Sequence, residues 1–156
     1  MRTDEEWLQL AVDRAVRNVA DGGGPFGALV VLDGEVVGAG SNRVTSTFDP
    51  TAHAEVVAIR AACRRIKNFS LAGATLYTSC EPCPLCLGAC LWARLDRVVY
   101  AADRFAAEAA GFDDATFHQL IASTTGAWPM MVEHLPLTAS NAPFEAWLAK
   151  PDRMPY

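Results

Sequence analysis

Two short motifs contain the residue types that a catalytic zinc ion requires. The first, His53-Ala54-Glu55, offers an imidazole and a carboxylate, and the second, Pro82-Cys83-Pro84-Leu85-Cys86, offers two thiols. Ligands from His53, Cys83 and Cys86 would leave the fourth tetrahedral position of zinc open, as in catalytic rather than structural sites. The sequence therefore predicts one catalytic Zn²⁺ per subunit.

Glu55 lies two residues after His53 and can reach a water on the metal without binding the metal itself. Zinc lowers the pKa of a bound water from about 15.7 to about 7, so hydroxide becomes available at neutral pH. A carboxylate beside it can move the water's proton to a ring nitrogen and then to a leaving amine. The pairing of H-x-E with P-C-x-x-C is a known signature of zinc nucleobase deaminases. We therefore predict a zinc-dependent aminohydrolase.

An iron–sulfur or structural zinc module is the non-enzymatic alternative. Four cysteines follow the C-x₂-C-x₂-C-x₃-C spacing of bacterial iron–sulfur proteins, namely Cys80, Cys83, Cys86 and Cys90. Leu91 stands where that motif has proline, the chain has no second cysteine cluster, and His53 and Glu55 would have no role. We expect Cys80 and Cys90 to be small buried residues instead.

The hydrophobic pattern predicts that each motif begins a helix. Helices are expected over 4–20, 52–67, 84–94, 114–121 and 143–150, and strands over 27–32, 35–40, 75–79, 98–101 and 130–135. Asp33-Gly34 between two Val-rich runs predicts a type I′ hairpin. Strands that alternate with helices after a hairpin indicate a mixed sheet with helices on both faces.

Bulk composition favours one globular domain and argues against a nucleic-acid partner. The chain has 156 residues, with 13 basic and 18 acidic side chains and a net charge of −5. Nucleic-acid binders usually present a basic face to phosphates. The N-terminus is polar and lacks an apolar leader, and no apolar run is long enough to span a membrane, so we expect a cytoplasmic protein.

The chain resembles the cytidine deaminase superfamily, and within it the bacterial guanine deaminases. The superfamily resemblance rests on the two zinc motifs. The narrower resemblance rests on Asp49-Pro-Thr-Ala-His53-Ala-Glu55, Tyr77-Thr-Ser-Cys-Glu-Pro-Cys83, Leu87-Gly-Ala, Trp92-Ala-Arg94, Ala109-Ala-Gly-Phe-Asp-Asp114 and Tyr156. It extends from about residue 25 to the end of the chain.

The resemblance implies a fold, an activity and an assembly. The fold would be a three-layer α/β/α sandwich with a mixed five-stranded sheet, formed by residues 1–156 as a single deaminase domain. The activity would be hydrolysis of guanine to xanthine and ammonia. The assembly would be a homodimer in which residues 151–156 form a tail that can cross to the partner.

The resemblance also implies roles for individual residues. Glu55 would be the main proton shuttle and Asp114 a second acid. Substrate contacts would come from Phe26, Asn42, Ala54 through its backbone, Trp92, and Tyr156 at the partner's site. Structural alternatives stay open for five of these residues: Phe26 and Trp92 as packing residues, Asn42 as a turn residue, Asp114 as a helix cap and Tyr156 as a frayed end.

Pocket contacts decide among small aminated rings, because such rings share the geometry of attack. Cytosine, an aminotriazine, another modified base or a nucleoside therefore remain alternative substrates. Adenosine in transfer RNA is a less favoured alternative, since its deaminases share both zinc motifs but must bind a polyanion.

Overall fold

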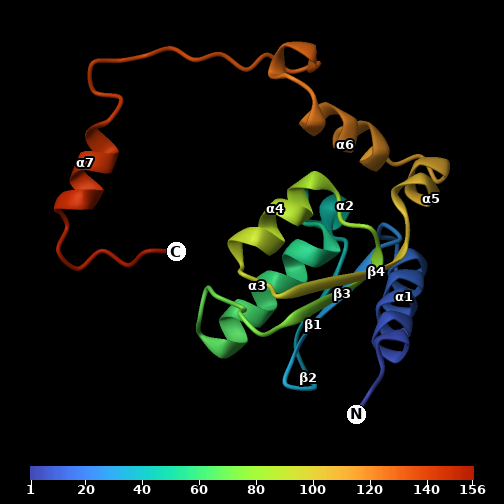
Figure 1. Ribbon diagram of the computed structural model, residues 1–156. Helices are drawn as coiled ribbons and strands as arrows, with labels where there is room; N and C mark the ends of the chain where they lie inside the picture. The colour runs from blue at the N-terminus through green and yellow to red at the C-terminus, as the bar shows by residue number, and fades with distance from the viewer.

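The computed structural model describes all 156 residues, and its helices and strands follow one another as Figure 1 shows. The elements are α1 (Asp4–Ala20), β1 (Gly27–Leu32), β2 (Glu35–Ser41), α2 (Val44–Thr47), α3 (Ala54–Ile66), β3 (Thr75–Cys80), α4 (Pro84–Trp92), β4 (Arg97–Ala102), α5 (Arg104–Ala109), α6 (Asp114–Ala122), η1 (Thr125–Ala127) and α7 (Ala142–Ala149). None of the helices has both the length and the apolar character needed to cross a bilayer.

The strands form one mixed sheet in the order β2-β1-β3-β4. Strand β1 is antiparallel to β2 and to β3, whereas β3 and β4 are parallel. The predicted hairpin is confirmed: Asp33 and Gly34 have φ values of 51° and 78°, as a type I′ turn requires at both central residues.

Helices cover both faces of the sheet, as predicted (Figure 1). Alternate residues of a strand point to opposite faces. Thus Leu29 and Val31 of β1 pack in one cluster with Trp7 of α1, while Ala28 and Val30 pack in the larger core with α3 and α4. The result is three layers: α1, the sheet, and the α3–α4 layer.

The prediction of a five-stranded sheet is wrong, because the sheet has four strands. Residues 130–135, the expected fifth strand, adopt no regular secondary structure and are exposed. A strand requires a hydrogen-bonded neighbour about 4.8 Å away. After α6 the chain leaves the body instead, so this segment has no such neighbour and β4 is left as an edge (Figure 1).

Two short helices, α2 and α5, were not predicted. Helix α2 has 4 residues and α5 has 6, so neither is long enough to give a helical repeat of apolar positions. Helix α5 depends on its cap, because Asp103 Oδ1 accepts hydrogen bonds from the backbone N–H groups of Phe105 and Ala106.

Two glycines in β2 set the depth at which α3 lies on the sheet. A Cβ atom added at Gly40 would overlap the carbonyl oxygen of Ala54, and one at Gly38 would overlap that of Ala58. The backbone of α3 therefore rests directly against β2. Since α3 begins at Ala54, this close approach fixes the residues on either side of the helix start relative to the sheet.

Candidate active site

Two helix N-termini bring the zinc motifs together. His53 is the N-cap residue of α3, and Cys83 is the N-cap residue of α4, where Pro84 occupies the first turn. The Nδ1 atom of His53 lies 3.5 Å from Cys83 Sγ and 3.4 Å from Cys86 Sγ. These three potential ligand atoms all lie within 4.8 Å of one another.

This donor set fits zinc. In tetrahedral coordination with Zn–N near 2.0 Å and Zn–S near 2.3 Å, a nitrogen and a sulfur ligand are about 3.5 Å apart. The two nitrogen–sulfur distances of 3.5 Å and 3.4 Å agree with that spacing. His53, Cys83 and Cys86 would therefore hold a zinc ion with a position left for a non-protein ligand.

The other two cysteines of the four-cysteine run do not join this group. Cys80 Sγ lies 3.7 Å from the carbonyl oxygen of Asp103, and Cys90 belongs to the main hydrophobic core. Burial raises the pKa of both thiols to about 12. They are small buried residues, as predicted, and the iron–sulfur alternative has no cluster of four converging sulfurs.

The surroundings of Cys83 favour the ionised form of its thiol. A hydrogen bond from Cys86, together with one from His53, holds the pKa of the Cys83 thiol well below its usual range. The thiolate of Cys83 in turn raises the pKa of His53. The site thus favours an anionic sulfur beside an imidazole, which is the chemistry expected of ligands for a soft divalent cation.

Glu55 is a buried carboxyl beside the ligand group. Its side chain is only 5% exposed, and its two oxygens lie 3.3 Å from Thr78 Oγ1 and 3.4 Å from Cys86 Sγ, both of which can donate to it. Burial raises the pKa of Glu55. A carboxyl held in this way, next to potential metal ligands, is suited to accept and return a proton.

A cavity of about 480 Å³ opens onto His53, Glu55 and Cys83. Its walls also include Phe26 and Asn42, and the rings of Phe26 and Phe112 meet edge to face with their centroids 4.8 Å apart. The Oδ1 atom of Asn42 accepts a hydrogen bond from the backbone N–H of Val44. A mixed aromatic and polar lining of this kind suits a small planar ring.

Asp114 reaches the same cavity from the first turn of α6. Burial raises the pKa of its carboxyl, and the nearby Cys83 thiolate raises it further. The structure therefore places two carboxyl groups, Glu55 and Asp114, at one cavity beside the ligand group.

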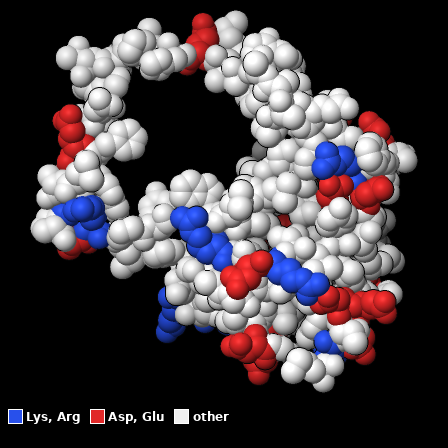
Figure 2. Space-filling view, in the orientation of Figure 1, with Lys and Arg blue, Asp and Glu red and all other residues white.

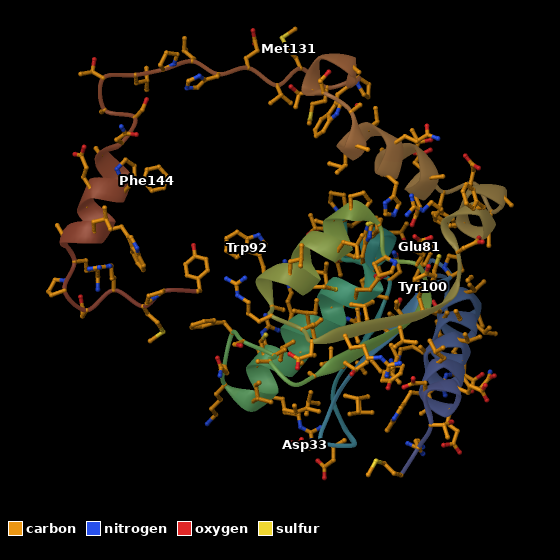
Figure 3. All side chains as sticks on the ribbon, in the orientation of Figure 1. Asp33, Glu81, Trp92, Tyr100, Met131 and Phe144 are labelled. Carbon is orange, nitrogen blue, oxygen red and sulfur yellow. The ribbon has the colours of Figure 1, made fainter.

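Three predicted substrate contacts are not part of the cavity lining. Trp92 is 64% exposed at the end of α4, where its ring lies 5.8 Å from that of Tyr156. Figure 3 shows Trp92 well separated from Glu81, which lines the cavity. Ala54 is fully buried in the core, so any contact would involve its backbone. The substrate roles of these residues stay predictions.

Phe112 and Glu81 are among the cavity residues that the sequence did not predict. Phe112 lies within the Gly111-Phe-Asp-Asp114 element, so its proximity to Asp114 was a usable signal. Glu81 lies between two cysteines and gave no signal of its own.

Comparison with known proteins defines the class. Residues 1–102 match the cytidine and deoxycytidylate deaminase zinc-binding region. The chain belongs to this family, and with His53, Cys83 and Cys86 in place it is a zinc-dependent deaminase.

Individual relatives show which kinds of deaminase within the family the chain is similar to. The chain is 46% identical to the guanine deaminase of Bacillus subtilis (strain 168) over 144 residues, which are 92% of each chain. A crystal structure of guanine deaminase from Bacillus subtilis matches with a TM-score of 0.95 and 44% identity, covering 99% of both chains. A tRNA-specific adenosine deaminase of Haemophilus influenzae is 36% identical over 79% of this chain and 75% of its own.

Proposed function

We propose that this chain hydrolyses guanine to xanthine and ammonia. The observation that carries the proposal is the convergence of two carboxyl groups, Glu55 and Asp114, on one cavity beside the zinc ligands. Similarity to guanine deaminase over nearly the whole chain supports the choice of substrate. The likeness to a tRNA-specific adenosine deaminase covers a smaller share of both chains.

The reaction replaces the C2–N bond of guanine with a C2–O bond from water, so protons must move from the water to the ring and to the amine. Bound zinc supplies Lewis-acid chemistry that lowers the pKa of water to near neutrality. Glu55 moves two protons in turn: it takes the first from the water and gives it to a ring nitrogen, then takes the second from the hydroxyl now on C2 and gives it to the departing amine. Its burial, with Thr78 as a hydrogen-bond donor, keeps the carboxyl in one place throughout.

Asp114 acts at the same cavity as a second acid that assists protonation of the amine. Ammonia is a far better leaving group than an amide anion, so a second proton source lowers the barrier to cleavage. Phe26 and Asn42 orient the base: Phe26, backed by Phe112, provides an apolar wall. Asn42, whose Oδ1 atom is held by Val44, offers its amide N–H₂ group to an acceptor on the base.

We also propose that the chain works as a homodimer. Residues 123–156 form an arm that leaves the body and curves back, with open space between the two (Figures 1 and 2). Helix α7 of the arm exposes the apolar side chains of Phe144 and Leu148. Helix α4 of the body exposes those of Leu91 and Trp92. Monomeric proteins rarely leave such surfaces uncovered.

Within that dimer, residues 1–156 form a single deaminase domain, and residues 151–156 cross to the partner and close its active site. In one chain Tyr156 lies against Phe69 and Trp92 rather than in the cavity. If the tail crosses, Tyr156 reaches the cavity of the partner, although it does not line the cavity of its own chain.

The test is ammonia release by the purified zinc-loaded protein. The panel is guanine, guanosine, adenine, cytosine, cytidine, an aminotriazine and an anticodon stem-loop that contains adenosine. We expect guanine to have the highest kcat/KM. Preference for another small ring would overturn guanine as the substrate, and preference for the stem-loop would favour a transfer-RNA deaminase.

A further inference from the structure

Helices α5 and α6 are fastened to the loop that precedes the zinc ligand Cys83. We propose that two polar contacts, between Arg104 and Glu81 and between His118 and Pro82, position Asp114 for catalysis. We call these two contacts the α5–α6 clasp. The inference rests on the proposed function, because it concerns the acid that assists deamination.

The first contact of the clasp joins the start of α5 to Glu81. Glu81 Oε1 accepts hydrogen bonds from Arg104 Nε at 3.1 Å and from Nη2 at 2.7 Å, while Oε2 accepts from the Arg104 backbone N–H at 2.8 Å. The Glu81 side chain is only 14% exposed. A fork of charge-assisted hydrogen bonds fixes orientation as well as distance. Figure 3 labels Glu81 at the end of the sheet from which α5 and α6 extend.

The second contact joins α6 to the next residue of the same loop. His118 Nε2 lies 3.1 Å from the carbonyl oxygen of Pro82, and because a carbonyl only accepts, Nε2 is the donor. Pro82 is fully buried and directly precedes Cys83. His118 follows Asp114 by four residues, so the two side chains lie on one face of the helix.

Apolar packing holds α5 and α6 only weakly. Ala107 is the only buried residue of α5, and Ala115 is the only buried residue of α6. Phe117 and Ile121 of α6 are about half exposed, at 49% and 58%. Beyond α6, Trp128 donates a hydrogen bond from Nε1 to the Leu120 carbonyl oxygen near the end of the helix, and the chain then leaves the body (Figure 1).

One aromatic contact also links this region to the body, between Phe112 and Phe26. Phe112 precedes α6, so this contact restrains the start of the helix more against translation than against rotation about its axis. The hydrogen bond of His118 restrains that rotation. Asp114 is thereby positioned relative to Cys83 through the two residues that directly precede Cys83.

Loss of the clasp should reduce the rate of reaction more than the binding of the base. Displacing a reacting group by about 1 Å can cost on the order of 100-fold in rate. We therefore expect His118→Ala to lower kcat about 10-fold or more, with KM changed less than about 2-fold. His118→Gln, which keeps an N–H donor, should recover part of the loss.

The experiment measures His118→Ala and Arg104→Met as single variants and again in combination with Asp114→Asn. Gln119→Ala, an exposed neighbour on the same helix, is the matched control. Measurements are kcat and KM for guanine, zinc content, and amide hydrogen exchange across residues 114–122. We expect faster exchange in the two clasp variants, unchanged zinc content, and almost no further loss of kcat when His118→Ala is added to Asp114→Asn.

Three results would overturn the clasp. They are an equal loss of kcat from His118→Ala with and without Asp114, unchanged exchange in α6, or loss of zinc from the variant, which would mean that the contact supports the ligand loop instead. Failure of the wild-type protein to deaminate guanine overturns the proposed function alone. In that case the exchange measurement, and kcat on whichever base the panel identifies, still test the clasp.

Discussion

Glu55 carries the most specific prediction at the scale of single residues. Glu55→Gln keeps an oxygen that can accept a hydrogen bond from Thr78, so we expect the fold and the bound zinc to be retained. The amide cannot take up and release a proton as the carboxylate does. General acid–base catalysis typically contributes about 10²- to 10⁴-fold in rate, so we expect kcat to fall by about that factor. Ammonia release and zinc analysis would measure both effects.

Glu108→Gln is the matched control for that substitution, since Glu108 is an exposed acid on α5. It should leave turnover unchanged. Turnover of Glu55→Gln at a rate close to the wild type would remove Glu55 from the proton path.

Cys83 carries a prediction about metal content. Cys83→Ala removes one of three ligands, so we expect zinc to fall from about one ion per chain toward none, and activity with it. Cys63→Ala is the control, because Cys63 lies on α3 with its sulfur 3.8 Å from the Phe69 carbonyl oxygen, outside the ligand group. Elemental analysis would decide, and a zinc-loaded, active Cys83→Ala protein would contradict the ligand assignment.

Residue types and spacing were enough to predict the ligand group and the position of Glu55, because zinc restricts its ligands to few residue types at short spacing. Phe26, Asn42 and Asp114 were expected from family resemblance, and the cavity brings them together. Glu81 could not be predicted, because its position depends on Arg104, which lies in a helix too short to have a sequence signature.

At the scale of elements, the close contact of α3 with β2 gives a stability prediction. Gly40→Ala would place a Cβ atom against the backbone of α3, and overpacking of this kind costs about 1–3 kcal/mol. We expect a lower midpoint of urea unfolding. Gly126→Ala is the control, because a Cβ there meets no atom within 4 Å. Equal stability of Gly40→Ala and wild type would show that α3 can shift freely.

The attachment of α1 to the sheet gives a prediction about pH. The buried Tyr77 of β3 donates a hydrogen bond of 2.6 Å from its hydroxyl group to the carboxylate of Asp4 at the start of α1. Burial, and in second place the contact with Asp4, raises the pKa of Tyr77 from 10.0 to about 12. In the unfolded chain the phenol loses its proton near pH 10, while the folded protein retains it. Unfolded molecules then bind fewer protons, so stability falls as pH rises from 10 to 12.

Tyr77→Phe should remove that part of the alkaline loss, although its stability at neutral pH will be lower because a buried hydrogen bond is gone. Tyr100→Phe, which changes a residue that is 46% exposed, should keep the wild-type slope. Denaturant unfolding at a series of pH values measures the slope. Parallel curves for the wild type and Tyr77→Phe would count against the role of Tyr77.

Long elements were predictable because each combines a clear apolar period with a local start or stop signal. Helix α1 is an example: Thr3 and Glu6 form a reciprocal capping box, and the predicted range of 4–20 is confirmed. Residues 130–135 show the limit of such reasoning. Their composition favours a strand, but a strand exists only where a neighbour is within reach, and a local pattern does not encode the neighbour.

At the scale of the whole molecule, the arm of residues 123–156 gives the last prediction. We expect light scattering to report twice the chain mass of 16.8 kDa, because exposed apolar side chains on α7 and α4 need a second copy to cover them. Leu148→Glu places a charge on the apolar surface of α7 and should shift the protein toward monomer. Ala139→Glu, an exposed change outside α7, should not.

Activity tells whether the arm serves the partner's site or only joins the two copies. If Tyr156 closes the site of the partner, the monomeric Leu148→Glu protein should bind guanine more weakly, with a higher KM, while it retains its zinc. Tyr156→Ala should raise KM without changing the mass, since it alters the contact with the base and leaves α7 intact. A wild-type monomer with full activity would exclude the dimer, and a dimer whose KM is unaffected by Tyr156→Ala would leave the arm a role in assembly alone.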